Sequence, residues 1–327
     1  MVVAIAGYYG YKNAGDEAML HSLVREAKAR GHQPIVLTAS PEETARELEV
    51  EAVHRYDLLE LTKAIARADL FLLGGGGLFQ DRTSYRSLLY YLALIRLARF
   101  FKKPRVVCGV SLGPLSPRGE RAVRRYLKGA TLVVRDRTSL AYARSLGLRA
   151  ELGGDPALLL EPPEIPREPG LVLFIPRYGV RLHAMISVAH KLAKEGRDVF
   201  ALALQPGKDD KVLELFKGVP QEATGDPKRA LYLIRSAEYV ISARLHGMVL
   251  AAAAGTPFAG VDYDPKVRGF ARDAGAHLLP ERPSAEAILR VLVERPEPNW
   301  NAILEMKRRV RATLDRVLPA PTPANGV

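Results

Sequence analysis

Two polar side chains, Arg244 and His246, interrupt the apolar stretch YVISARLHGMVLAAAAGTP at residues 239–257. Burying a charge or an imidazole among apolar residues costs free energy unless a partner satisfies it. EYVIS is typical of a buried strand and RLHGMVLAAAAG of a helix, so the pair lies where a strand passes into a helix. A guanidinium beside the amide groups of a helix N-terminus is typical of a phosphate or carboxylate site. His246 could bind the same anion or transfer a proton, although a lone histidine is often structural.

A second candidate stretch, GYYGYKNAGDEAML at residues 7–20, ends the first apolar run and opens a helical pattern. Gly10 and Gly15 allow the backbone to approach a ligand closely, and a helix N-terminus favours anions. The stretch lacks the G-x-G-x-x-G nucleotide fingerprint. Asn13 and Asp16 could cap the helix, or Asp16 could instead take a proton from a hydroxyl group, and the local sequence favours neither interpretation.

Four consecutive glycines occur in LLGGGGLFQD, residues 72–81, directly after a buried strand. A tight turn between a strand and a helix needs fewer glycines than this. We therefore expect a loop in which Gly75, Gly76 and Gly77 let backbone amides point at a ligand, with the tight turn as the alternative.

Three more basic residues follow apolar runs. Arg135 follows TLVV, Arg177 follows LVLFIP, and Lys266 lies just beyond PFAGVDYD. Side chains at the carboxyl ends of parallel strands face the ligand-binding crevice of an α/β domain, so each could bind an anion. For Arg135 an ion pair with Asp155 or Asp136 is the alternative.

The elements that must position these residues alternate between strands and helices throughout the chain. Strands are predicted at 2–7, 34–39, 69–77, 105–113 and 131–136, and again at 171–177, 198–207, 237–244 and 257–264. Apolar runs that alternate with helical patterns predict parallel sheets covered by helices on both faces. The fold class is therefore α/β, with two Rossmann-like doubly wound domains and a cleft between them.

Four prolines in EPPEIPREPG, residues 161–170, indicate a stiff linker between the two domains. This predicts an N-terminal domain on the acceptor side, the linker, a C-terminal domain on the donor side, a C-terminal helix and a flexible tail. The expected boundaries are 1–161, 162–170, 171–298, 299–318 and 319–327, respectively.

Composition narrows the function classes. The chain has 327 residues and a formal net charge of +12, which favours an anionic partner. No nucleic-acid-binding module and no metal-ligand cluster occurs, so we expect neither nucleic acid nor a metal or other cofactor. The single cysteine, Cys108, fits a reducing cytosol and inert packing. Abundant arginine and proline suggest a thermophile, with a GC-rich genome as the alternative.

Residues 85–103, YRSLLYYLALIRLARFFKK, allow two interpretations. A helix with basic residues near one end can lie on a bilayer surface, which would give peripheral contact with a membrane. The alternative is a crossover helix packed on the sheet. No run reaches the ~18 uncharged apolar residues that a membrane span requires.

Together these stretches resemble the polysaccharide pyruvyl transferase family. The resemblance rests on GYYGYKNAGDEAML, LLGGGGLFQD, VSLGPL, VVRDRTS, GGDPALLL and ISARLHGMVLAAAAGTPFAGVDYDPKV, in this order, and covers roughly residues 3 to 275. The branch that looks most similar acts on bacterial cell-wall polymers, where it places a 4,6-linked pyruvyl ketal on N-acetylmannosamine and serves S-layer anchoring.

The resemblance implies the two-domain GT-B architecture of glycosyltransferases and phosphoenolpyruvate as donor. The Arg-Leu-His donor motif of the family falls on Arg244, Leu245 and His246. The first-domain arginine of the family falls on Arg135, and its acidic position on Asp16. The resemblance also implies that Arg177 and Lys266 bind the donor.

The implied chemistry suits these residue types. Phosphoenolpyruvate carries a phosphate and a carboxylate, so several cations are needed to bind it. His246 is the candidate acid for C3 of the enol, and Asp16 the candidate base for the sugar hydroxyl. The implied acceptor is a saccharide, expected to be lipid-linked, and the expected location is the cytoplasm at the inner face of the plasma membrane.

Two alternatives stay open from the sequence. A nucleotide-sugar glycosyltransferase of the same fold could use the arginines and glycines to bind a diphosphate. A non-catalytic scaffold could use the basic charge and the helix at 85–103 to bind a polysaccharide or a membrane.

Overall fold

The computed structural model describes residues 1–82 and 84–320 of the chain. The chain divides into two compact units. Unit 1 comprises Met1–Tyr11, Met19–Pro156 and the residues from Lys307 onwards, and unit 2 comprises Lys12–Ala18 and Ala157–Met306. Residues 12–18 therefore group with the second unit, although they lie near the start of the chain.

Unit 1 contains a parallel sheet of seven strands in the order β3-β2-β1-β4-β5-β6-β7. The alternating apolar runs of the sequence form this sheet, since strands that are covered on both faces require apolar side chains on both. The strands are β1 (Val2–Ala6), β2 (Gln33–Thr38), β3 (Glu51–His54), β4 (Leu70–Phe79), β5 (Arg105–Leu112), β6 (Thr131–Val134) and β7 (Ala150–Leu152).

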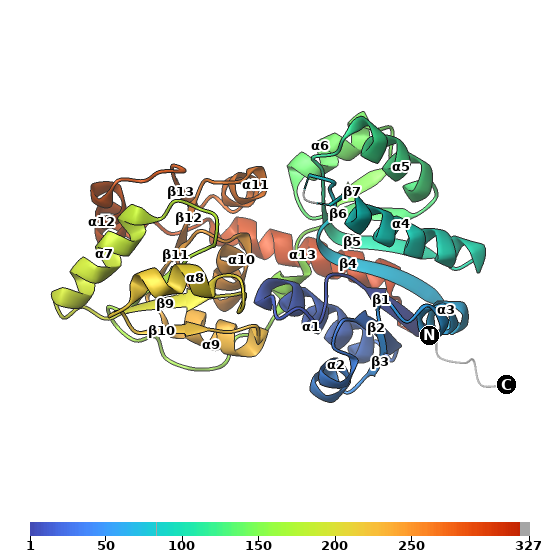
Figure 1. Ribbon diagram of the computed structural model, residues 1–327, viewed down its shortest axis with the longest axis horizontal. Coiled ribbons are helices and arrows are strands. Elements are labelled where there is room, and N and C mark those ends of the chain that lie inside the picture. Colours follow the sequence, from blue (N-terminus) through green and yellow to red (C-terminus); the bar gives the residue numbers. More distant parts are fainter. Residues whose placement is uncertain (83, 321–327) are drawn as a thin grey trace. The chain divides into compact units, whose positions relative to one another are not determined.

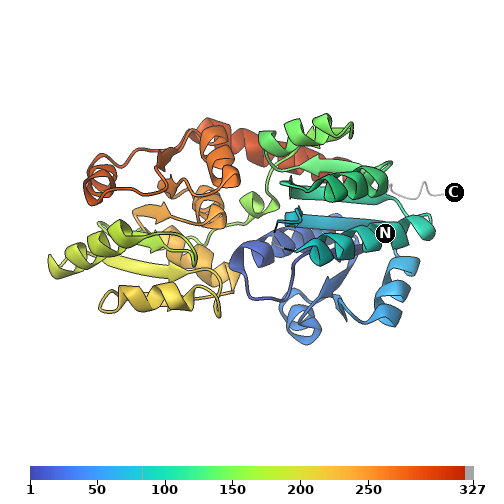
Figure 2. The same cartoon turned by 45° about the horizontal axis from the view of Figure 1, so that its top comes forward.

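Helices cover both faces of this sheet (Figure 1). One face carries α3, α4, α5 and α6, whose buried side chains pack with those of the sheet into one core. Figures 1 and 2 show α4 and α5 side by side in this layer. The helices are α1 (Ala14–Ala29), α2 (Pro41–Leu48), α3 (Leu58–Arg67), α4 (Tyr85–Phe100), α5 (Pro117–Leu127) and α6 (Arg137–Ser145), followed by the short η1 (Pro156–Leu159).

The four glycines belong to strand β4, which confirms the strand predicted at 69–77 and contradicts the loop that the same glycines also suggested. Gly75 and Gly76 have positive φ values of 70° and 82°, which a residue with a side chain rarely adopts. The pairing of β4 with β5 shifts register between Gly76 and Phe79. The glycines thus continue the strand through an irregular stretch instead of ending it.

Unit 2 contains a parallel sheet of six strands in the order β10-β9-β8-β11-β12-β13. The strands are β8 (Val172–Ile175), β9 (Val199–Ala203), β10 (Gln221–Ala223), β11 (Tyr239–Ser242), β12 (Phe258–Val261) and β13 (His277–Leu279). Two doubly wound parallel-sheet α/β domains, as expected from the sequence, are therefore present.

The core of unit 2 lies between its sheet and the layer that contains α7, α8 and α12. On the other side α10 packs against α9 and α11. The helices of the second half of the chain are α7 (His183–Lys194), α8 (Asp210–Leu213), η2 (Glu214–Phe216), α9 (Pro227–Ser236), α10 (Leu245–Ala254), α11 (Pro265–Asp273), α12 (Ala285–Glu294) and α13 (Trp300–Val317).

Some segments differ from what the sequence suggests. The proline-rich residues 162–170 group with unit 2, where the Glu168 amide donates to Ser236 O at 2.7 Å. Helix α13 contributes residues to both units, because the division falls between Met306 and Lys307. Of the tail predicted at 319–327, residues beyond 320 lie outside the described part of the chain. No helix within the described ranges is long and apolar enough to cross a membrane.

Candidate functional site

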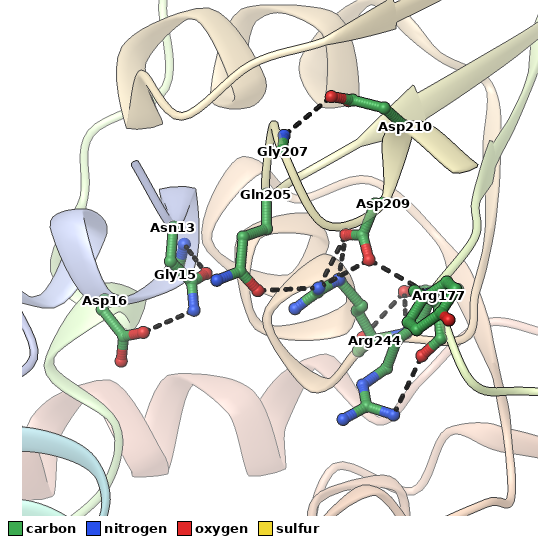
Figure 3. A network of polar contacts seen from close by, with 11 residues as sticks. Asn13, Gly15, Asp16, Arg177, Gln205, Gly207, Asp209, Asp210 and Arg244 are labelled. Atoms are coloured by element: carbon green, nitrogen blue, oxygen red, sulfur yellow. Dashed lines mark hydrogen bonds and ion pairs between the residues drawn. The ribbon is translucent and has the colours of Figure 1, made fainter. Parts of the chain in front are cut away.

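The carboxyl edge of the unit 2 sheet gathers most of the predicted site residues. Successive strands run outward from β8 in one direction and from β11 in the other, so the strand order reverses between these two. Ligands of open α/β sheets bind beside the carboxyl ends of the strands at such a reversal. Arg177 follows β8, and Arg244 and His246 follow β11. Figure 3 shows Arg177 and Arg244 together at this edge.

Arg244 is held by a carboxylate that the sequence reasoning missed. Its Nε and Nη2 donate to the two oxygens of Asp209 at 2.6 and 2.8 Å, and Nη2 also donates to Gln205 Oε1 at 3.1 Å (Figure 3). The Arg244 side chain is 12% exposed and Asp209 is fully buried. A bidentate pair of this kind fixes the plane of the guanidinium. The pair satisfies the buried charge and orients the arginine.

The turn between β11 and α10 is locked by Ser242. Its hydroxyl accepts a hydrogen bond from the Arg244 amide at 3.0 Å and donates one to Arg244 O at 2.7 Å. Gly247 is required beside it, because a Cβ there would lie under 3.0 Å from Ser242 Oγ. Arg244 is the N-cap of α10, and a guanidinium has no acceptor with which to cap the first amides. Leu245 is buried at the first helical position.

His246 packs against the first turn of α1. A Cβ on Gly15 would lie under 3.0 Å from Cγ and Nδ1 of the imidazole, so only glycine fits opposite the ring. The Ala14 amide donates to Leu204 O at 2.9 Å, which ties this turn to the segment after β9. Residues 12–18 thus bring Asp16 into unit 2, next in sequence to the glycine that the imidazole touches.

Asp16 is buried in the first turn of α1 and accepts a hydrogen bond from Asn13 Nδ2 at 2.5 Å (Figure 3). Asn13 in turn accepts the Gly15 amide at 3.3 Å, and its carbonyl accepts the Glu17 amide. Asn13 therefore begins the helix, as one interpretation of the sequence had it. Asp16 lies within the first turn, where a carboxylate interacts favourably with the helix dipole.

Arg177 and Lys266 lie at the same edge of the unit 2 sheet. The Arg177 guanidinium carbon lies 4.7 Å from the centroid of the Tyr263 ring, which is a cation–π contact, and among residues 1–82 and 84–320 no carboxylate forms an ion pair with Arg177. Tyr263 follows β12, the neighbour of β11. Lys266 lies in the first turn of α11, and its Nζ is 3.8 Å from Asp264 Oδ2. The edge from β8 to β12 thus presents three cationic side chains.

Arg135 lies in unit 1 and forms the ion pair that the sequence left as an alternative. Its Nη1 donates to Asp155 Oδ2 at 3.2 Å, and its Nε donates to Ser111 Oγ at 2.7 Å. Both side chains of the pair are buried. Asp136 lies 4.0 Å from Arg135 Nε at its Oδ2, and it also caps α6 by accepting the Ser139 amide at 2.7 Å. A role of Arg135 in donor binding stays a prediction.

The glycines of unit 1 lie at the strand reversal of its own sheet, between β1 and β4. A Cβ on Gly10 would meet Thr38, and one on Gly75 would meet Met19. These two positions are thus explained by close packing against protein atoms. Gly77 is exposed, and a Cβ there would meet nothing within 4 Å.

A cluster of tyrosines around Arg55, which was not predicted from the sequence, lies beside the stretch that begins at Gly7. The Arg55 guanidinium carbon lies 4.5–5.5 Å from the ring centroids of Tyr11, Tyr56, Tyr90 and Tyr91. Its Nη1 donates to Gly7 O at 3.1 Å. Burial, followed by the hydrogen bond with Tyr56, raises the pKa of Tyr11 to about 12.

The outer members of this cluster expose aromatic faces. Tyr8 stacks on Tyr11 with ring centroids 4.3 Å apart, and Tyr56 is 59% exposed. We call Tyr8, Tyr11 and Tyr56 the tyrosine platform. The clue in the sequence is GYYGY followed much later by HRY, and only the pairing of β1, β2 and β3 brings these segments together.

Asp209 and Gln205 had a weaker signal in the sequence. They lie in LQPGKDD after an apolar run that predicts a strand, so their place at a carboxyl edge could be inferred, but their contact with Arg244 could not. Over residues 1–82 and 84–320, no group of three or more histidine, cysteine or acidic side chains could hold a metal ion.

Solved structures share the fold of this chain at low identity. HepE of Anabaena in complex with UDP and glucose is 14% identical, with a TM-score of 0.61 over 98% of this chain and 100% of that one. UDP-GlcNAc 2-epimerase of Neisseria meningitidis bound to UDP-GlcNAc is 12% identical, with a TM-score of 0.60 over 97% and 99%. A glycosyltransferase of Rickettsia africae is 12% identical, with a TM-score of 0.56 over 97% and 93%. The two domains are thus of the GT-B type found in glycosyltransferases.

Sequence comparison gives the family. A search of curated proteins finds no match to this chain. The polysaccharide pyruvyl transferase family, by contrast, matches residues 13–265, a range that includes Asp16, Arg135, Arg177, Arg244 and His246. The match extends over more than half of the chain, and so the chain belongs to the polysaccharide pyruvyl transferase family.

Proposed function

We propose that this protein transfers the enolpyruvyl group of phosphoenolpyruvate to a saccharide and closes a 4,6-pyruvyl ketal with release of phosphate. The observation that carries the proposal is the grouping of Arg177, Arg244 and His246 at the strand reversal of unit 2, in a chain of this family. The acceptor we propose is N-acetylmannosamine in a bacterial cell-wall polysaccharide or its lipid-linked precursor, used at the cytoplasmic face of the plasma membrane.

The donor would bind at the carboxyl edge of the unit 2 sheet. Arg244, oriented by Asp209, contributes a guanidinium of fixed plane, and Arg177 and Lys266 contribute two further cations. The N-terminus of α10 adds amide groups that favour an anion. Phosphate and carboxylate together need several such donors, which this edge supplies. Arg135 of unit 1 is a further donor-binding candidate.

The chemistry needs one acid and one base. Asp16 takes the proton of the attacking sugar hydroxyl, whose oxygen bonds to C2 of the enol while His246 protonates C3. This gives a tetrahedral intermediate that still carries phosphate. The C2–O bond to phosphate then breaks, and the second sugar hydroxyl attacks C2 and gives its proton to the departing phosphate as the ring closes. Transfer of the first proton from Asp16 to His246 restores both residues. The arginines stabilise the charge that develops on the leaving phosphate.

The acceptor would bind at unit 1 on the tyrosine platform. Tyrosine rings offer an apolar face and a polar hydroxyl, a combination suited to the mixed apolar and polar surface of a sugar ring. Tyr8 and Tyr56 are exposed at the carboxyl edge of the unit 1 sheet, where open α/β sheets bind ligands. Gly77 lies exposed after the middle of β4, and close approach of the acceptor to its backbone would explain the absence of a side chain there.

A direct assay tests the proposal. The purified chain is given phosphoenolpyruvate and an N-acetylmannosamine-containing acceptor, and phosphate release and acceptor mass are followed. We expect phosphate release that depends on the acceptor, together with the mass increase of one pyruvyl ketal. Folded protein that releases no phosphate with any such acceptor would contradict the proposal.

The fold shared with UDP-binding proteins supplies the alternative of a nucleotide-sugar glycosyltransferase. Thermal unfolding separates the two, because a ligand that binds the folded state raises the melting temperature. Phosphoenolpyruvate should raise it and UDP-sugars should not. The reverse result would favour the glycosyltransferase.

A further inference from the structure

The positive charge of this protein is concentrated in one stretch. Residues 82–135 contain thirteen lysines and arginines and one acidic residue, Glu120. This stretch therefore has an excess of twelve positive charges, which equals the formal net charge of the whole chain, +12. Basic and acidic residues are equal in number over the remainder of the sequence, so the basic character of the protein belongs to this stretch.

Folding spreads this charge over the outer side of two neighbouring helices, α4 and α5, which pack against one another. Their inner sides are buried in the core of unit 1, so the crossover-helix interpretation of residues 85–103 is correct for that side. The outer side and the ends of the two helices form a surface that we call the α4–α5 face. Its exposed basic residues are Arg86, Arg96, Arg99, Lys102, Arg118, Arg121, Arg124, Arg125 and Lys128.

In the parts of the chain that the structure describes, these basic residues are not paired with carboxylates. Within the described parts of the chain, none of the nine forms an ion pair, although ion pairs are common elsewhere on the surface. Burial and the neighbouring Arg99 lower the pKa of Arg105, so positive potential builds up at this end of the face. Like charges that repel one another destabilise the fold unless a ligand of opposite charge compensates them.

Apolar side chains project from the same face. Phe100, at the end of α4, is 76% exposed, and Leu89 is exposed on the same helix. Within the described residues, the ring of Phe100 contacts one other aromatic ring, that of Phe101, and the two centroids are 5.1 Å apart. Arg96, Arg99 and Lys102 flank it in sequence. An exposed aromatic ring surrounded by cations is the pattern of a helix that lies on anionic lipid.

We propose that the α4–α5 face docks the protein on an anionic lipid bilayer. The basic side chains attract the headgroups of anionic lipids, and Phe100 inserts into the interface between headgroups and acyl chains. A nucleic acid fits the observations less well, because contacts to its phosphate backbone are polar and do not account for the exposed apolar side chains of Leu89 and Phe100. The proposal concerns a surface of unit 1 and does not depend on the proposed function.

Vesicle sedimentation with the full-length chain tests this docking. We expect binding to phosphatidylcholine vesicles that contain about one third phosphatidylglycerol, weak binding to pure phosphatidylcholine, and loss of binding at ~1 M salt. Because each basic residue near the surface contributes about a fivefold change in affinity, the variant Arg96→Gln/Arg99→Gln should bind more than about tenfold more weakly. Phe100→Ser should weaken binding without changing the charge.

A matched control comes from unit 2. Arg282→Gln/Arg290→Gln removes two exposed charges from residues outside the α4–α5 face and should bind vesicles as the unchanged chain does. Circular dichroism confirms that each variant is folded. Equal binding of both double variants would overturn the proposal, as would failure of the unchanged chain to bind anionic vesicles. Tighter binding to duplex DNA than to vesicles at equal phosphate concentration, lost in Arg96→Gln/Arg99→Gln, would assign the face to nucleic acid instead.

Discussion

The imidazole of His246 lies directly against the backbone of Gly15, and it leaves no room for a side chain at position 15. The two residues are 231 positions apart in sequence but belong to the same compact unit. This packing sets the position of the ring beside the first turn of α1, which carries Asp16. The candidate acid and the candidate base of the proposed reaction are thus positioned by one contact.

Gly15→Ala should destabilise the protein by about 1–3 kcal/mol, because a Cβ would collide with the imidazole. Alanine is otherwise the better helix residue, by about 0.5–1 kcal/mol. In a chain that already carries His246→Gly, which removes both the ring and the Cβ that a Cβ on Gly15 would meet, the same Gly15→Ala change should therefore be neutral or stabilising. Chemical denaturation of the four chains of this cycle measures the difference. An equal effect of Gly15→Ala in both backgrounds would show that the ring does not set this constraint.

His246→Gln separates the acid role from anion binding. Glutamine keeps a hydrogen-bond donor but cannot supply a proton at neutral pH. If His246 protonates C3, kcat for acceptor-dependent phosphate release should fall about 10²–10⁴-fold while KM for phosphoenolpyruvate changes little. A raised KM with kcat retained would assign the imidazole to anion binding alone. Comparison of the circular dichroism spectra checks that the variant keeps its fold.

Asp209→Asn should disturb Arg244 through the loss of a charged acceptor. Hydrogen bonds to charged groups contribute about 1.5–3 kcal/mol each, so we expect a destabilisation of at least ~2 kcal/mol and a raised KM for phosphoenolpyruvate. Asp210→Asn is the matched control. Asp210 is exposed and accepts the Gly207 amide at 2.7 Å, and its substitution should cost less than about 1 kcal/mol and leave KM unchanged. Equal KM values in the two variants would argue against a positioning role for Asp209.

The central strands could be predicted from the sequence, because strands that are buried on both faces appear as continuous apolar runs. β3, β7, β10 and β13 could not, since these short strands form the edges of the sheets and are only partly buried. The place of Arg177 and Arg244 at a carboxyl edge could be predicted, because each comes directly after a predicted strand. The partner of Arg244 did not, because Asp209 is 35 residues away and only the pairing of β8 with β9 and β11 brings them together.

The glycine run of β4 shows a second limit of sequence reasoning. Four consecutive glycines suggest a loop that approaches a ligand, yet β4 continues through Gly74–Gly77. Tertiary packing explains part of this, because a Cβ on Gly74 would meet Leu23 and one on Gly75 would meet Met19. These neighbours come from α1, whose approach to β4 cannot be read from the local sequence.

Tyr56→Ala should raise KM for the acceptor by about tenfold, because an exposed aromatic face for the sugar is lost. KM for phosphoenolpyruvate should stay the same, since Tyr56 lies in unit 1 and the proposed donor residues Arg177 and Arg244 lie in unit 2. Tyr56→Phe keeps the ring and should retain most of the affinity for the acceptor. Steady-state kinetics with each substrate varied in turn gives the comparison. An unchanged acceptor KM in Tyr56→Ala would remove the tyrosine platform from the acceptor site.

Cys108 is buried in β5, and burial, followed by the negative charge of Asp155, raises the pKa of its thiol to about 12. A thiol reagent should therefore leave the folded chain unlabelled at neutral pH and modify it once the chain is unfolded. The unfolded thiol ionises near pH ~8.5, so the free energy of unfolding should fall as pH rises from about 9 to 12, by up to ~1.4 kcal/mol per pH unit. Cys108→Ala should lose this part of the slope while the tyrosine contributions remain. Rapid labelling of the folded chain at neutral pH would show instead that β5 opens or that the thiol is reactive.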